Sequence, residues 1–317
     1  MYLGGRPNFL NSSSLYRIQW RLAQLAAHLV VALVALVVVG GATRVMEAGL
    51  ACPDWPLCFG SLLPGSKMNA QVFLEWFHRL DAFLIGITLL VQLLLSLIWR
   101  AQLPRWLPWF YSFLVLLVLI QGGLGALTVV NLLPSGIVTA HLALALTLVA
   151  AMSGLTQRLL ATNDVPSPLW WRFMSGGCLI AVFGQSLLGA RMATTWAAQR
   201  CLNQGQACHW LALHRTSAIP ITAFLLLFVI TSLFAGEWSR SQWRFLLVVS
   251  LLSVTQITLG VITLRLGLQQ PWITISHQLV ATLLVACLAA LSCRSLAGRQ
   301  SSLPLIPKES RLETCHG

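Results

Sequence analysis

Four histidines are spaced so regularly along the chain that they suggest two copies of one ligand set. His78 and His214 are 136 residues apart, as are His141 and His277, and within each half 63 residues separate the two histidines. An imidazole is a common ligand of iron, zinc and copper in proteins. The spacing therefore predicts a duplicated site in which the two histidines of each half act together.

The composition indicates that a membrane surrounds these histidines. Of the 317 residues, 57% are hydrophobic and only 9% are charged, whereas soluble domains carry about 25% charged residues. The net charge of +12 comes from scattered lysines and arginines, and nucleic-acid binding proteins gather theirs into a patch. We therefore expect a membrane protein that contacts lipid and does not bind nucleic acid.

Each of the four histidines lies near the start of an apolar run long enough to cross a bilayer, which takes about 20 helical residues. The first run of the chain is also too long for a cleavable signal sequence. We predict eight spans, at 24–43, 74–98, 108–130, 137–157, 173–193, 210–234, 244–264 and 273–293.

A second repeated motif supports a duplication of the whole four-helix unit. Residues 121–128 (QGGLGALT) match residues 256–263 (QITLGVIT) at an offset of 135. We therefore predict an all-α polytopic membrane protein whose eight transmembrane helices form two pseudo-symmetric four-helix bundles. The expected halves are residues 1–163 and 164–317, related by an axis along the membrane normal because both halves contain an even number of spans.

The basic residues predict the orientation of the spans. With the N-terminus inside, thirteen lysines and arginines lie on the inner side and seven on the outer side, as the positive-inside rule prefers. Both termini are then cytoplasmic, and all four histidines lie near the outer face.

Two histidines from two helices of one bundle can bind a heme iron from opposite sides. Zinc or copper is the competing interpretation, which the nearby cysteines keep open. Arg79 and Arg215 each follow a histidine directly and could pair with heme propionates. The alternative is that they are ordinary arginines at helix ends, whose charged groups extend to the membrane surface without binding a ligand.

Glu75 distinguishes the first half from the second. It precedes His78 by three residues, so both side chains lie on one helix face, whereas the second half has Leu211 at the equivalent position. A carboxylate in an apolar site can accept a proton or stabilise positive charge; a salt bridge is the alternative role. The asymmetry predicts chemistry in the first half.

One pair of cysteines lies in the first outer loop of each half. They are Cys52 with Cys58 and Cys201 with Cys208, and outer-face pairs suggest disulfides formed in an oxidising compartment. The first pair could take part in redox chemistry or could simply hold the loop together.

Several of these motifs together resemble the heme A synthase (CtaA/Cox15) family, in its bacterial type with a cysteine pair in the first outer loop. The resemblance covers about residues 24–293. It rests on the later histidines and on the segments GGATR (40–44), EAGLACPDWPLCFG (47–60), EWFHR (75–79) and QGGLG (121–125).

The resemblance implies an oxidoreductase that converts the C8 methyl of heme O to a formyl group, giving heme A for heme-copper terminal oxidases. It implies that His214 and His277 bind a resident heme b and that His78 and His141 bracket the substrate heme O. Glu75 would be the catalytic acid, and Cys52 and Cys58 the loop pair.

The same resemblance implies a bacterial inner-membrane protein that works with a heme O synthase and an electron donor that the sequence does not identify. The rival hypothesis is a non-enzymatic cytochrome with two hemes b that passes electrons between a quinol and a partner. That hypothesis explains the four histidines equally well but leaves Glu75 and the loop cysteines without a role.

Overall fold

Eight long helices dominate the computed structural model, which describes residues 9–160, 164–165, 167–194, 209–294 and 296–297. Each is long and apolar enough to cross a membrane, so the prediction of an all-α multi-pass membrane protein is confirmed. The spanning helices are α1 (Phe9–Val45), α2 (Ala70–Ile98), α3 (Leu107–Val130), α4 (Ser135–Leu160), α5 (Leu169–Thr194), α7 (His209–Phe234), α9 (Trp243–Arg265) and α10 (Pro271–Ser292).

Short elements connect these helices. A 3-10 turn, η1 (Gly65–Lys67), precedes α2, and the four-residue helix α8 (Glu237–Arg240) joins α7 to α9. The two-residue strands β1 (Asp164–Val165) and β2 (Leu296–Ala297) pair antiparallel. This pair is the described exception to the all-helical prediction, and it joins the segment between the halves to the segment that follows α10.

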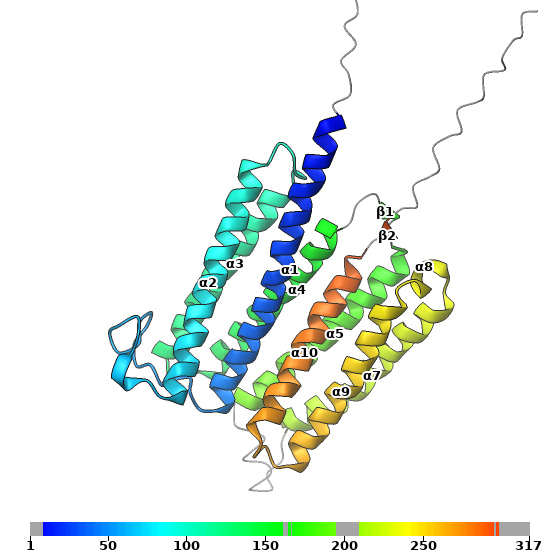
Figure 1. Cartoon of the computed structure of the whole chain (residues 1–317). Helices are drawn as coiled ribbons and strands as arrows, with labels where there is room; N and C mark the ends of the chain where they lie inside the picture. The colour runs from blue at the N-terminus through cyan, green and yellow to red at the C-terminus, as the bar shows by residue number, and fades with distance from the viewer. Residues whose placement is uncertain (1–8, 161–163, 166, 195–208, 295, 298–317) are drawn as a thin grey trace, which may run out of the picture.

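The helices form two groups of four that lie side by side (Figure 1). In the first group, α1 to α4 contact one another around a ring; in the second, α5, α7, α9 and α10 do the same. The groups meet where α10 contacts α1 and α4 and where α4 contacts α5. Half of the most apolar 18-residue stretch of α10 is buried, against 6% of the corresponding stretch of α3. Helix α10 is therefore central, and α3 faces lipid.

Polar contacts join the two groups of helices. Ser153 Oγ in α4 donates to the carbonyl oxygen of Ala286 in α10 at 2.7 Å, and the Arg44 guanidinium in α1 donates to the carbonyl oxygen of Ala193 in α5. Because a lipid interior gives helices little hydrophobic reason to associate, such hydrogen bonds and close packing hold them in register.

Capping explains where the histidine-bearing helices begin. Asn69 caps α2, and its side chain accepts from the backbone N–H groups of Gln71 and Val72 at 3.0 Å each. This cap starts α2 four residues before the predicted 74, since an amide oxygen at that position satisfies otherwise unpaired N–H groups. Pro271 begins α10 two residues early by a different means, because its fixed φ suits the first helical position and it has no N–H to leave unpaired there.

All four histidine-bearing helices run in the same direction. In Figure 1, α2, α4, α7 and α10 begin at the end of the molecule opposite to the start of α1 and the end of α10. The histidines lie in the first three turns of these helices, so they share that end. The predicted position of this end on the outer face stays a prediction.

Candidate functional site

Each of the four imidazoles packs against a glycine on a neighbouring helix. In the first group, a Cβ placed on Gly40 of α1 would lie 2.9 Å from His78 Cε1, and one placed on Gly125 of α3 would lie 3.4 Å from His141 Cε1. Any side chain at these positions would press on a ring. The glycines therefore form part of each histidine site.

The second group repeats this arrangement. A Cβ on Gly189 of α5 would lie 3.0 Å from His214 Cε1, and one on Gly260 of α9 would lie 3.1 Å from His277 Cε1. Within each group, two helices contribute a histidine and the other two contribute the glycine that the histidine rests on. The sequence analysis gave the repeated QGGLG and QITLG motifs but did not pair glycines with histidines.

Three of the four imidazoles keep a buried ring nitrogen without a hydrogen bond. Within the described residues, the Nδ1 atoms of His78, His141 and His214 are buried and have no partner. Such atoms are uncommon in folded proteins, because each forgoes its hydrogen bonds to water. Together with His277, these imidazoles give each group two histidines that rest on glycines, the number that axial ligation of a heme iron uses.

At His277 a backbone carbonyl oxygen lies close to the ring. Its Nδ1 lies 3.1 Å from the carbonyl oxygen of Gln256, which can hold the proton on Nδ1. Nε2 is then the lone-pair nitrogen available to a metal.

Glutamines from both groups belong to the site although the sequence analysis gave them no role. Gln121 Nε2 donates to the His141 carbonyl oxygen at 3.0 Å and lies 3.4 Å from His141 Nε2. Gln256 Nε2 lies 3.3 Å from His277 Nε2. The 135-residue offset of the QGGLG and QITLG motifs contained the signal, because the histidines repeat at almost the same offset.

Glu75 is buried in the second turn of α2 and is held from two sides. Its Oε2 accepts from the backbone N–H of Cys52 at 2.8 Å, and its Oε1 forms an ion pair with Arg79 at 2.5 Å. The residue is 4% exposed, so both oxygens are fixed by protein donors rather than by bulk water.

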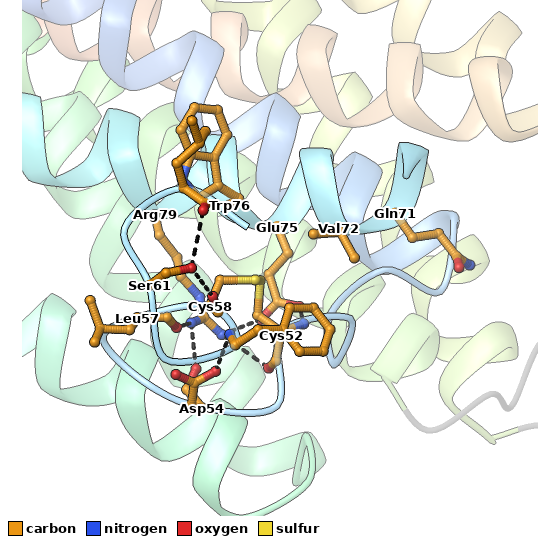
Figure 2. The surroundings of a disulfide bond; sticks show 12 residues. Cys52, Asp54, Leu57, Cys58, Ser61, Gln71, Val72, Glu75, Trp76 and Arg79 are labelled. Carbon is orange, nitrogen blue, oxygen red and sulfur yellow. Dashed lines mark hydrogen bonds and ion pairs between the residues drawn. A yellow bond between two sulfur atoms is a disulfide. The ribbon is translucent and has the colours of Figure 1, made fainter. Parts of the chain in front are cut away.

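Arg79 anchors the loop between α1 and α2 onto α2, as Figure 2 shows. Besides Glu75, its guanidinium donates to the carbonyl oxygens of Asp54 and Leu57 at 2.6 Å each. The repeat-related Arg215 is exposed, and no hydrogen bond or ion pair joins it to the described part of the chain. The two arginines that the sequence treats as equivalent therefore have different surroundings.

The predicted disulfide between Cys52 and Cys58 is present, with sulfurs 2.03 Å apart, and both cysteines are buried. Asp54 closes the loop: its carboxylate accepts from the backbone N–H groups of Gly60 at 2.8 Å and Phe59 at 2.6 Å. The hydrogen bond from Gly60, with further help from Phe59, lowers the pKa of Asp54 below its usual 3.8. The predicted pair Cys201 and Cys208 lies outside the described residues.

The groups found near the histidines define what the site can bind. Across the described ranges, no three histidine, cysteine, aspartate or glutamate side chains converge as a metal cluster. Each half instead offers two imidazoles from different helices, the number that bis-histidine heme ligation uses. One half adds a buried carboxylate, because Leu211 stands at the position of Glu75 in the other.

Known proteins agree with this arrangement. The family model described as "Cytochrome oxidase assembly protein", COX15-CtaA, matches residues 23–289. A protein of Bradyrhizobium diazoefficiens named heme A synthase is 30% identical, over 90% of this chain and 93% of that relative. One of Sphingopyxis alaskensis with the same name is 27% identical, over 86% and 91%.

Other relatives match over shorter regions. A heme A synthase of Shewanella oneidensis is 31% identical over 52% of this chain, and that match spans about half (55%) of the relative's length. The family match nevertheless covers all eight spans with little omitted at either end. The chain therefore belongs to the COX15-CtaA family of cytochrome oxidase assembly proteins.

Proposed function

We propose that this protein is a heme A synthase, an oxidoreductase that converts the C8 methyl of heme O to a formyl group and supplies heme A to heme-copper terminal oxidases. The observation that carries the proposal is Glu75, the one acid that is buried among the described residues, which lies one turn from His78 and has Leu211 at the equivalent position of the other histidine site. The names of the full-length relatives support it.

In the second half, His214 and His277 would hold a heme b. This resident heme would supply one-electron redox chemistry when bound. The chain's own contribution is to seat both imidazoles on Gly189 and Gly260 and to orient the His277 ring through the carbonyl oxygen of Gln256. Both features favour a fixed ligand geometry.

In the first half, His78 and His141 would bracket heme O as the substrate. Glu75 would then accept a proton from the reacting group or stabilise positive charge as it develops there. Its contacts with Cys52 N–H and with Arg79 hold the carboxylate in one orientation before substrate arrives, which reduces the reorganisation that the reaction requires.

Arg79 and Arg215 would pair with heme propionates in their respective halves. Arg215 is exposed and follows His214 directly. Arg79 would have to share its guanidinium between a propionate and the loop carbonyls that it now binds. The proposal for Arg79 therefore includes movement of the loop when heme O enters.

The remaining proposals concern the setting of the enzyme. The protein would reside in the bacterial inner membrane with both termini cytoplasmic and the histidine sites near the outer face. Cys52–Cys58 would act as a loop staple or in redox chemistry, and Cys201–Cys208 would form a second disulfide. A heme O synthase would supply substrate, and a separate electron donor would serve the second half.

The test is to express wild type and Glu75→Ala together with a source of heme O, then extract and separate the hemes. Wild type should yield heme A, whereas Glu75→Ala should retain bound heme and yield little heme A. A normal yield of heme A from Glu75→Ala would refute the role of this acid. A wild type that binds only heme B would favour the di-heme electron-transfer cytochrome.

A further inference from the structure

A glutamine side chain crosses between the two halves directly beside the histidine sites. Gln278 follows His277 in α10, and its Nε2 donates to the carbonyl oxygen of Val37 in α1 at 2.9 Å. A Cβ placed on Gly41 would lie 2.1 Å from Gln278 Oε1 and 2.5 Å from its Cδ. The amide therefore lies on the bare backbone of α1, where only glycine leaves room for it.

The same turn of α1 supports the first-half histidine. Gly40 faces His78, with 2.9 Å between an added Cβ and the ring, and Gly41 is the next residue. Successive residues of an α-helix point about 100° apart. One turn of α1 therefore contacts His78 through Gly40 and contacts Gln278, the neighbour of His277, through Gly41. A short chain of contacts thus joins the two sites.

The contact has no equivalent in the other direction. The 136-residue offset of the histidines places Leu142 at the position of Gln278. The 149-residue offset between Gly40 and Gly189 places Ala190 at the position of Gly41. A leucine has no hydrogen-bond donor, and an alanine has the Cβ that Gly41 lacks, so the repeat replaces both partners of the contact.

A polar side chain within an apolar span is unfavourable and tends to mark a functional position. We propose that Gln278 is a positioning residue that sets the spacing and relative orientation of the two histidine sites. It does so by holding the start of α10, with His277, against the α1 turn that supports His78. The inference rests on the proposed function only in taking these sites to bind hemes.

General helix adhesion is the competing explanation, because interhelical hydrogen bonds stabilise many membrane proteins. Both explanations predict a less stable protein when Gln278 is removed. Only the positioning role predicts a changed ligand geometry at His277 while the protein remains folded. The measurement must therefore report on the iron site as well as on stability.

The experiment compares Gln278→Leu, Gly41→Ala and the double variant. Gln278→Leu gives the second half the residue that the first half carries. Gln92→Leu in α2 is the matched control, because Gln92 is a fully buried transmembrane glutamine whose amide atoms have no hydrogen-bond partner among the described residues. Gly86→Ala is the control for the glycine, since an added Cβ there meets Val118 at an ordinary 3.6 Å.

Two properties are measured on purified protein: the electron paramagnetic resonance spectrum of the ferric heme b with its affinity, and the thermal midpoint without heme. Both single variants should shift the same heme b signal and weaken heme b binding by about tenfold, as loss of residues supporting metal ligands does. The double variant should be no worse than the worse single, because both changes remove one contact. The controls should leave the spectrum unchanged.

An unchanged heme b spectrum alongside a lower thermal midpoint would overturn the proposal and leave Gln278 as an adhesive contact. Additive effects in the double variant would also overturn it. If the single variants do not fold, Gln278→Asn, which keeps a polar amide but is one methylene too short to reach Val37, should shift the same signal, and no shift would refute the role. Absence of heme A from wild type would contradict only the proposed function; a wild type that binds no heme would overturn both.

Discussion

The two halves of the molecule share a histidine and glycine framework but differ in what surrounds it. In the first half, a buried carboxylate, an arginine and a disulfide loop form one connected network around Glu75. In the second half, Leu211 stands in place of the acid and Arg215 is exposed. The two groups therefore present the same histidine and glycine pairs, and they differ in the charged groups around those pairs.

We expect the largest effects from substitutions of the histidines, which should separate the heme that each half binds. His214→Ala or His277→Ala should remove most of the heme b, because one axial ligand is lost from a site with two. His78→Ala and His141→Ala should keep heme b and lose heme O. Pyridine hemochrome spectra and chromatography of extracted hemes measure both; loss of heme b on changing His78 would contradict the division of roles.

Substitutions of the glycines that support the imidazole rings should have the next largest effect on heme content. Gly40→Ala and Gly189→Ala bring a Cβ to 2.9 and 3.0 Å from an imidazole, whereas Gly125→Ala brings one to 3.4 Å. Overpacking of this kind destabilises by about 1–3 kcal/mol, so the first two variants should lose more heme than the third. Heme content per protein and thermal midpoints test the order, with Gly86→Ala as the control; equal losses would refute it.

Sequence patterns were sufficient for the spans, because apolar length along the chain predicted eight of them to within a few residues at most ends. The 136-residue and 63-residue intervals singled out four histidines, and these lie in the first three turns of four matched helices. The exception is α1, which begins at Phe9, well before the predicted 24. A helix does not have to stop where its apolar segment does.

The sequence pattern could not predict contacts between segments that are distant along the chain. The pairing of Gly40 with His78 depends on how closely α1 approaches α2, and that of Gln278 with Gly41 on how α10 crosses between the halves. Likewise, Arg79 and Arg215 read as equivalent, and only the fold of the loop shows that Arg79 binds Asp54 and Leu57. Such specificity comes from tertiary packing, which periodicity does not encode.

The arginine comparison gives the third prediction. Arg79→Lys should loosen the loop between α1 and α2, because a lysine cannot keep the fork of bonds to the loop carbonyl oxygens and Glu75. Hydrogen bonds to a charged group contribute roughly 1.5–3 kcal/mol. Cys52 and Cys58 are buried, so the rate at which a phosphine reduces their disulfide reports loop opening and should rise. Arg215→Lys is the matched control, and an equal rise there would contradict the assignment.

The smallest expected effect concerns Asp54, whose ionisation should make closure of the loop between α1 and α2 depend on pH. Hydrogen bonds from Gly60 and then Phe59 lower the pKa of Asp54 below 3.8, whereas in an open loop it should be near its usual value of about 3.9. The carboxylate therefore stabilises the closed loop fully above about pH 4. That stabilisation is lost as pH falls through the lowered pKa.

Phosphine reduction of the Cys52–Cys58 disulfide should consequently accelerate below about pH 4 in wild type. Asp54→Asn should be reduced slightly faster at neutral pH and should show a flatter dependence on acid, since its amide oxygen replaces two charged acceptors with one neutral acceptor. Glu47→Gln, a change at an exposed acid just before the same loop, should keep the wild-type profile. If Asp54→Asn retains the full acid acceleration, another group controls loop opening, and the Gly60 and Phe59 contacts do not govern access to the disulfide.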